Sequence, residues 1–243
     1  MKKLYIIKAG STFASTIAEL GDFEAWIIRA LGTLSIPVEV VNAVHGEPLP
    51  LPDECCGVLV TGSHAMVTQN LPWSVGIESW IPLLVGAGVP FLGICYGHQL
   101  LGRAMGGKVG YHPKGSETGT VTLTLTTEAG DDLLFQHIPS TFRAHATHAQ
   151  SVLELPPGAV TLARNAHDPH HAFRVGTAAW GVQFHPEYTA AVMQAYINAD
   201  CDSLSRSGCD VSALLREVTH TPEASGILRK FAVHVERSCT AEG

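Results

Sequence analysis

The stretch VPFLGICYGHQLLG, residues 89–102, places a cysteine between an apolar run and a run that favours a helix. The apolar part, 89–94, is typical of a buried strand, and the part after Cys95 is typical of a helix that ends at glycines. Gly93 and Gly97 flank the cysteine and give the pattern G-x-C-x-G. Small neighbours permit a sharp strand-to-helix turn, so the stretch predicts an α/β sheet that displays Cys95 at the carboxyl end of a strand.

Strand-like and helix-like patterns alternate on the N-terminal side of this stretch. Helices are expected at 16–34 and 73–87, the second with a kink or break at Pro82. Such alternation predicts an open, mostly parallel sheet with helices on both faces. Strands are expected at 4–8, 38–43, 57–62 and 89–94.

The second half of the chain has a different pattern. TGTVTLTLTT, residues 118–127, alternates strictly, as a half-exposed strand does, and further short strands follow up to 184. Helical patterns cover 189–205 and 210–235, the latter interrupted near Pro222. We therefore expect a small antiparallel part, and one domain over residues 1–200 with residues 201–243 as its helical C-terminal extension.

Composition excludes several classes of function. Of the 243 residues, 46% are hydrophobic and 15% are charged, which suits a sizeable core. The formal net charge of -7, without a run of Lys or Arg, argues against nucleic acid or an anionic membrane as partner. The sequence contains no run of 18 apolar residues, so it predicts no membrane-spanning helix. The apolar part of MKKLYIIKAGS is too short for a signal peptide.

Cysteine and histidine positions argue against metal binding. The six cysteines follow neither a paired metal spacing nor a small-domain disulfide framework, which favours a reducing, cytoplasmic setting. Most histidines are also scattered without a metal-ligand spacing, and we interpret them as surface or loop residues. These histidines are His45, His64, His112, His167, His170 and His171.

A second motif, GVQFHPEY at residues 181–188, supplies what a cysteine nucleophile requires. A thiol needs a base, and the base needs an acceptor that orients it. His185 and Glu187 are two residues apart, so on an extended backbone they project to the same side. Taken alone, the cysteine fits a buried residue in a glycine-rich turn and His-Pro-Glu fits a structural turn; together they favour a Cys95–His185–Glu187 triad.

GICYGHQLLG together with GVQFHPE resembles the class I (triad-type) glutamine amidotransferase family. VTGSHAMVTQNLPW, residues 60–73, resembles the oxyanion segment of that family, and the similarity covers roughly residues 1–195. Within the family, the chain is most similar to stand-alone proteins that resemble the glutamine amidotransferase domain of GMP synthase. The resemblance implies a flavodoxin-like sheet, a glutamine or γ-glutamyl substrate and no cofactor.

The resemblance also implies roles for individual residues. Cys95 would attack the glutamine carboxamide, with the backbone N–H of Tyr96 and that of Gly62 or Ser63 binding the oxyanion. His185 would protonate the departing ammonia and then activate water against the thioester. Substrate contacts are implied for Gln99, Glu117, His148, Ala149, Gln150 and Ser151, where several family members carry an acidic residue at the position of Gln150.

Three functions stay open at this point. The chain has no phosphate loop of the G-x-x-x-x-G-K-[ST] kind and no SGGxDS-type loop, so an ammonia acceptor would belong to a synthetase partner. The second alternative is a γ-glutamyl peptidase or amidase that uses the same triad. The third is a catalytically silent binding or regulatory module on this fold.

Overall fold

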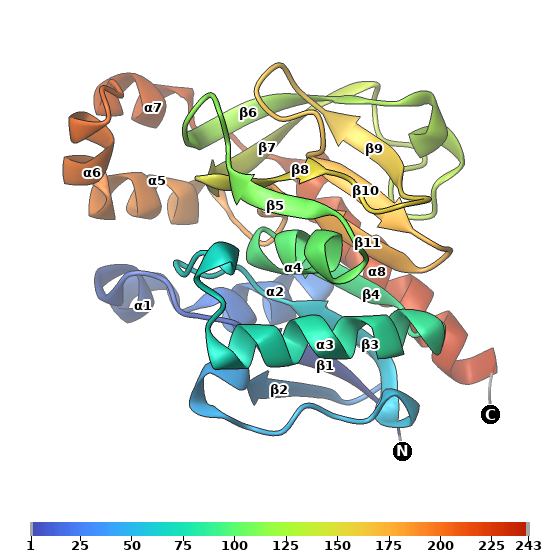
Figure 1. Cartoon of the computed structure of the whole chain (residues 1–243). Coiled ribbons are helices and arrows are strands. Elements are labelled where there is room, and N and C mark those ends of the chain that lie inside the picture. The colour runs from blue at the N-terminus through green and yellow to red at the C-terminus, as the bar shows by residue number, and fades with distance from the viewer. Residues whose placement is uncertain (1, 242–243) are drawn as a thin grey trace.

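A nine-stranded sheet forms the centre of the protein, whose computed structural model describes residues 2–241 (Figure 1). Its strand order is β2-β1-β3-β4-β11-β10-β9-β6-β7. The first five strands in this order pair in parallel, and the last five pair antiparallel, so that β11 belongs to both parts. The strands are β1 (Lys3–Lys8), β2 (Val38–Asn42), β3 (Cys55–Val60), β4 (Phe91–Ile94), β6 (Glu117–Leu125), β7 (Thr141–His148), β9 (Val160–Arg164), β10 (Ala172–Val175) and β11 (Ala179–Val182).

Two further strands, β5 (Lys108–Tyr111) and β8 (Gln150–Glu154), form a separate antiparallel pair. This pair lies over α4 (Tyr96–Ala104), which contacts both of its strands (Figure 1). The open, mostly parallel sheet and the small antiparallel part were predicted from the sequence, and the structure confirms this fold class.

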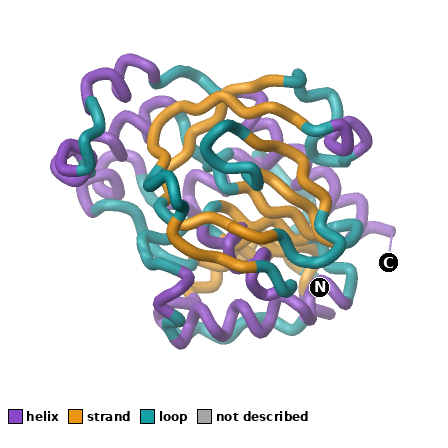
Figure 2. Tube along the Cα trace, turned by 45° about the horizontal axis from the view of Figure 1, so that its top comes forward, coloured by secondary structure: helices purple, strands orange, loops and turns teal. Residues whose placement is uncertain are grey.

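Helices cover both faces of the sheet, as Figure 2 shows. On one face α2 (Phe23–Leu31) and α8 (Pro222–Ala241) bury apolar side chains against the strands. On the other face α3 (Pro72–Gly86) and α4 do the same. Burial on both faces explains why β3 and β4 are apolar throughout, since neither face of these strands meets water.

A third, smaller apolar cluster joins the remaining helices to α2. It contains Phe23 and Trp26 of α2 with Tyr188 and Tyr196, and it brings the C-terminal helices to the edge of the sheet near Cys95. The helices that surround this cluster are α1 (Ala14–Leu20), α5 (Ala190–Ala199), α6 (Cys201–Arg206) and α7 (Val211–Glu217).

The structure corrects the expected helix at 16–34, which is two helices. Gly21 has a φ of 89°, and Asp22 caps α2 by accepting hydrogen bonds from the backbone N–H groups of Thr12 and Phe23. Of the kink or break expected at Pro82, the break is wrong, because α3 runs through that residue; the kink stays a prediction. The interruption near Pro222 is confirmed, since α8 begins there.

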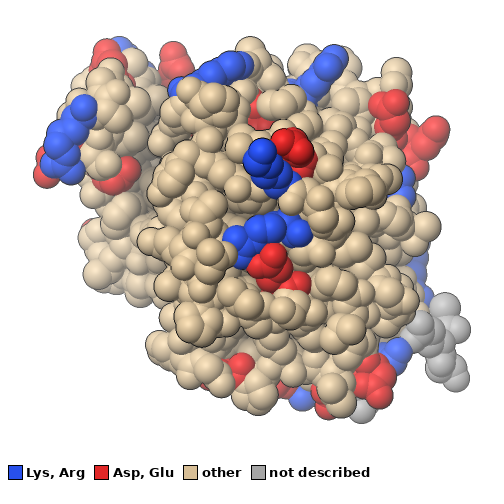
Figure 3. Space-filling model, in the orientation of Figure 1, with Lys and Arg blue, Asp and Glu red and all other residues tan. Residues whose placement is uncertain are grey.

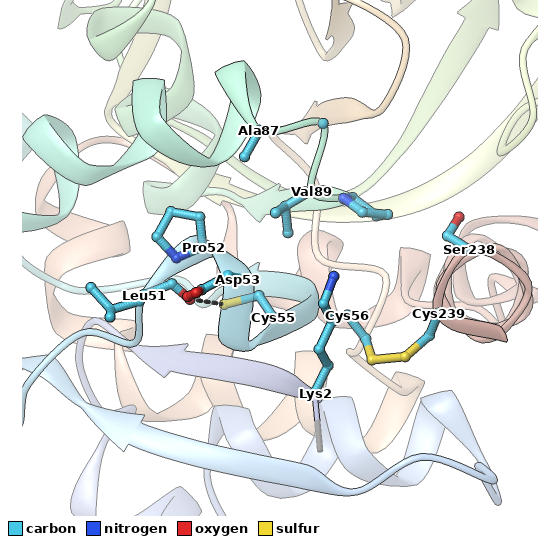
Figure 4. A pocket seen from close by; sticks show the side chains of 12 residues that line it. Lys2, Leu51, Pro52, Asp53, Cys55, Cys56, Ala87, Val89, Ser238 and Cys239 are labelled. Atoms are coloured by element: carbon cyan, nitrogen blue, oxygen red, sulfur yellow. Dashed lines mark hydrogen bonds between the residues drawn. A yellow bond between two sulfur atoms is a disulfide. The ribbon is translucent and has the colours of Figure 1, made fainter. Parts of the chain in front are cut away.

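A disulfide between Cys56 and Cys239 joins β3 to the C-terminal helix α8. The sequence analysis does not anticipate this pairing, because 183 residues separate the two cysteines. The disulfide borders a cavity of about 440 Å³ that also contains the free thiol of Cys55 (Figure 4). The division of the chain at residue 200 stays a prediction.

Charged side chains do not gather into one patch on the face seen in Figure 3, where Lys and Arg are scattered among Asp and Glu. Among the described helices, none combines the length and the apolar character that a bilayer crossing needs.

Candidate active site

Cys95 occupies a sharp turn between β4 and α4. Its backbone has φ 49° and ψ −92°, a left-handed conformation that costs a non-glycine residue free energy. The turn needs both flanking glycines, because a Cβ on Gly93 would lie 2.3 Å from the carbonyl of Gly97, and one on Gly97 would lie 2.5 Å from the backbone oxygen of Val60. The predicted strand-turn-helix display of Cys95 is therefore present.

His185 follows β11, the strand that pairs in parallel with β4. Cys95 N–H donates to Val182 O at 2.8 Å and joins the ends of β4 and β11, while His185 N–H donates at 2.8 Å to the backbone oxygen of His145 in β7. Adjacent parallel strands end at the same edge of a sheet, so the two motifs meet there although 90 positions separate them.

The side chains of Cys95 and His185 lie beside each other at this edge. A Cβ placed on Gly62 would lie 3.0 Å from the His185 ring and 3.8 Å from the Cys95 Cβ, so both side chains border the same small space. Cys95 Sγ itself lies 3.7 Å from the backbone oxygen of Thr147 and 3.5 Å from Gln183 Nε2. Glu187 completes the line, with its Oε1 2.7 Å from His185 Nδ1. All three residues are at least nine-tenths buried.

Electrostatic interactions within this line raise the pKa of His185. Burial alone would lower the pKa, but the charges of Glu187 and Cys95, and hydrogen bonds to both, outweigh it and raise the pKa to about 10. The ring is thus a cation at neutral pH, held between a carboxylate and a sulfur. A neighbouring imidazolium favours the thiolate form of a cysteine, which is the nucleophilic form.

Backbone N–H groups surround the sulfur. Tyr96 is the first residue of α4, so its N–H has no acceptor within the helix and lies next to Cys95. Gly62 and Ser63 follow β3, and Gly62 lies against both Cys95 and His185. These are the donors predicted for an oxyanion, and their role stays a prediction.

A cavity of about 370 Å³ opens above Cys95. On one side its wall comes from the turn after β3 and from α4; on the other it comes from β6, from the end of β7 and from α5 and α6. The side chains and backbone that line it belong to Phe13, Ser63, His64, Ala65, Met66, Cys95, Gln99, Ser116, Thr118, Thr147, His148, Ala149, Gln150, Tyr196, Asp200, Ser203, Leu204 and Ser207.

Four of the six predicted substrate residues line this cavity: Gln99, His148, Ala149 and Gln150. Gln99 Nε2 donates to the backbone oxygen of Gln150 at 2.7 Å and thereby fixes the segment from α4. The Gln150 side chain itself donates to Thr68 Oγ1 at 2.6 Å.

The other two predicted residues, Ser151 and Glu117, lie behind the cavity wall. Ser151 is completely buried, with its Oγ 3.2 Å from His148 Nδ1. Glu117 is hydrogen bonded to the rings of His148 and His171. Direct contact of these two side chains with a substrate stays a prediction.

Sequence analysis missed the part of the cavity that α5 and α6 provide. Tyr196, Asp200, Ser203, Leu204 and Ser207 line it, although this region has no recognisable motif. His64, interpreted as a surface or loop residue, also lines it and packs its ring 4.6 Å from Phe13. The only available signal was the position of His64 directly after the predicted oxyanion turn.

Comparisons with known proteins identify the family of the chain. The model of the family described as glutamine amidotransferase class-I matches residues 17–202. The chain is 32% identical over 184 residues to the glutamine-hydrolysing GMP synthase of Aeropyrum pernix, a match that covers 75% of this chain and 32% of that protein. It is 31% identical over 139 residues to γ-glutamyl peptidase 4 of Arabidopsis thaliana, covering 56% and 55% of the two chains.

A crystal structure of a glutamine amidotransferase from Thermotoga maritima has the same fold, with a TM-score of 0.76 at 23% identity over 97% of this chain and 99% of that one. The chain spans only about a third of the length of the GMP synthase that it matches. From the extent of the family match, this chain belongs to the class-I glutamine amidotransferase family.

Proposed function

We propose that this protein hydrolyses the side-chain amide of glutamine with Cys95 as nucleophile, His185 as acid and base, and Glu187 as the residue that orients His185. The observation that carries the proposal is the buried group of these three side chains, of which Cys95 lines the 370 Å³ cavity and Glu187 is hydrogen bonded to His185. Family membership supports it, because the relatives' names include glutamine hydrolysis.

Acylation begins from a Cys95 thiolate beside a His185 imidazolium. The sulfur attacks the carboxamide carbon of glutamine, and the carbonyl oxygen becomes an oxyanion that accepts from Tyr96 N–H and from Gly62 or Ser63 N–H. The C–N bond breaks as His185 gives its proton to the nitrogen, so ammonia leaves and a glutamyl thioester stays on Cys95.

Deacylation uses the same groups in reverse. Water attacks the thioester carbon while neutral His185 takes a proton from it, and the carbon–sulfur bond breaks to release glutamate and the Cys95 thiolate. Glu187 keeps a proton on His185 Nδ1 throughout, so that Nε2 is the atom that exchanges protons with the reacting groups.

We further propose that the ammonia is used by a synthetase partner. This chain corresponds to 32% of the Aeropyrum GMP synthase, and it carries neither of the nucleotide-binding loops sought in its sequence.

A second candidate function is γ-glutamyl peptidase activity. The cavity favours it, because the space that opens at Cys95 has a volume of about 370 Å³, which admits a leaving group larger than ammonia. The match to the Arabidopsis γ-glutamyl peptidase covers more than half of that protein.

Glutamate release from glutamine and from γ-glutamyl dipeptides distinguishes the two. Turnover of glutamine that disappears in Cys95→Ala supports the first proposal, and a preference for the dipeptides supports the second. If the enzyme needs a partner for turnover, a glutamine-like electrophile that alkylates thiolates should still label Cys95, and mass spectrometry should detect the added mass of the reagent. If the protein neither turns over these substrates nor is labelled at Cys95, it is a silent module.

A further inference from the structure

Behind the cavity wall, one carboxylate and two imidazoles converge. Glu117 is the first residue of β6, His148 is the last residue of β7, and His171 immediately precedes β10. Their ligand atoms all lie within 4.8 Å of one another. The two histidine side chains are at most 1% exposed and the Glu117 side chain is 11% exposed, so the cluster is nearly closed to solvent.

Both imidazoles direct Nε2 at the same carboxylate oxygen. Glu117 Oε2 lies 3.1 Å from Nε2 of His148 and 2.7 Å from Nε2 of His171. The second oxygen, Oε1, accepts a 2.7 Å hydrogen bond from Asn165 Nδ2, which fixes the plane of the carboxylate. The charge of Glu117 is thereby held in one orientation inside the protein.

The surroundings of His148 determine which of its nitrogens carries a proton. Nδ1 lies 3.1 Å from the backbone oxygen of Gln150, and a carbonyl oxygen can only accept, so this contact requires a proton on Nδ1. In a neutral ring Nε2 then presents a lone pair to Glu117. A histidine that donates from one nitrogen to a backbone carbonyl and aims the other at a shared point has the arrangement of a metal ligand.

The Nδ1 atom of His171 has no such acceptor among the described residues. Its Nδ1 is buried and has no hydrogen-bond partner among residues 2–241. If Nδ1 carries the proton of a neutral ring, a second lone pair faces the Glu117 oxygen across 2.7 Å. Such facing lone pairs repel unless a metal ion lies between them; without a metal ion, the proton of the neutral ring is on Nε2 and is donated to the carboxylate.

We propose that Glu117, His148 and His171 bind a zinc ion. Two imidazoles and one carboxylate are a known zinc ligand set, with bonds of about 2.0–2.2 Å. Two such bonds at the tetrahedral angle separate the ligand atoms by about 3.3–3.6 Å, slightly more than the 3.1 and 2.7 Å observed here. Small movements of the rings therefore admit the ion, and water completes its coordination.

The ion would stabilise the cavity wall, because one of its ligands, His148, lines the cavity. The other two ligands lie outside the residues that line it. It would connect the start of β6, the end of β7 and the segment before β10. The end of β7 leads directly to Gln150, whose backbone oxygen accepts a hydrogen bond from Gln99. Spacing along the chain could not reveal the site, since its ligands are 31 and 23 positions apart.

Equilibrium dialysis of the chelator-treated protein against zinc, followed by elemental analysis, tests this proposal. All proteins in the test carry Cys95→Ser, which removes a thiolate that could bind zinc and makes the result independent of any hydrolytic activity. We expect one zinc per chain, with affinity at least about 10-fold weaker in Glu117→Gln and in His171→Gln. His45→Asn, which removes an exposed imidazole, serves as the control and should bind as the parent does.

Thermal unfolding shows whether each variant folds and gives a second measurement. Zinc should raise the Tm of the parent and of the His45 variant, but not that of the two ligand variants, because only a folded site gains stability from binding. Absence of stoichiometric zinc in the parent, or equal uptake by parent and Glu117→Gln, would overturn the proposal. The cluster would then be a set of hydrogen bonds held by protons alone.

Discussion

Nδ1 of His185 lies 2.7 Å from Oε1 of Glu187, and both side chains are almost fully buried. The two residues are separated only by Pro186, whose fixed φ limits how the backbone can turn between them. A short, rigid segment thus places the carboxylate against one ring nitrogen and leaves the other for Cys95. The orientation of the base is determined locally, whereas its meeting with the sulfur depends on the pairing of β4 with β11.

Replacement of Glu187 by Gln should therefore reduce kcat with little change in KM. The amide keeps the shape but no longer stabilises the imidazolium, and we expect a loss of roughly 10²- to 10⁴-fold. Steady-state glutamate release measures the effect. Glu19→Gln, an exposed carboxylate of α1, is the matched control. Retention of wild-type kcat in the Glu187 variant would exclude this residue from the mechanism.

The raised pKa of His185 predicts how stability depends on pH. Its ordinary value is 6.5 and the folded value is about 10, so the folded state binds the proton more tightly than the unfolded state. The stabilisation from this group is fully present below pH 6.5 and is lost as pH rises toward 10. Denaturant unfolding at several pH values should show the free energy of unfolding falling across this range.

The Glu187→Gln variant isolates this contribution from other groups that titrate in the same range. Removal of the Glu187 charge lowers the folded pKa of His185, because that charge is the largest cause that raises it. The decline in stability should then still begin near pH 6.5, but it should end at a lower pH and be smaller in total. Identical pH profiles for the two proteins would show that the buried pair does not exist in solution.

Glycine substitutions test the turn that displays Cys95. An alanine Cβ at residue 93 would lie 2.3 Å from the backbone of Gly97, so Gly93→Ala should lower the free energy of unfolding by about 2–3 kcal/mol or prevent folding. Gly76→Ala in α3 is the control, because a Cβ there meets nothing within 4 Å, and we expect a gain of roughly 0.5–1 kcal/mol. Equal stability of the two variants would contradict the tight turn.

Periodicity predicted the fold well where burial on both faces leaves one solution. The apolar runs at 57–62 and 89–94 coincide with β3 and β4, which lie in the middle of the sheet. The expected helix at 16–34 failed because the apolar pattern continues across Gly21 and Asp22, while the backbone turns there. Local capping outweighed the helical period at that point.

The site was predictable as far as motifs extend. Cys95, His185 and Glu187 follow strand ends, and the edge of a parallel sheet brings such positions together. The walls contributed by Tyr196 and Asp200 were not predictable, because nothing in the sequence of α5 and α6 indicates on which side of the sheet they pack. Their position follows from the apolar cluster around Phe23 and Tyr188, a tertiary arrangement without a sequence signature.

Asp200 shows what this unpredicted wall contributes. Asp200 is the only acidic residue among the described residues that line the cavity, and it lies between α5 and α6. Burial raises its pKa, although His64 opposes this shift, and a carboxylate at this place can attract the α-ammonium group of glutamine. Asp200 is not one of the three residues proposed to take part in the reaction, so its effect should appear in substrate binding.

Asp200→Asn should accordingly raise KM for glutamine by roughly 5-fold and leave kcat nearly unchanged, because a partly exposed ion pair contributes about 1 kcal/mol at most. Asp202→Asn, an exposed carboxylate of α6, is the matched control and should behave as wild type. Added salt should raise KM of the wild type more than that of the Asp200 variant, since salt screens a charge that the variant lacks. An unchanged KM in Asp200→Asn would show that Asp200 does not contribute to substrate recognition, because the substitution removes the acidic side chain that lines the cavity.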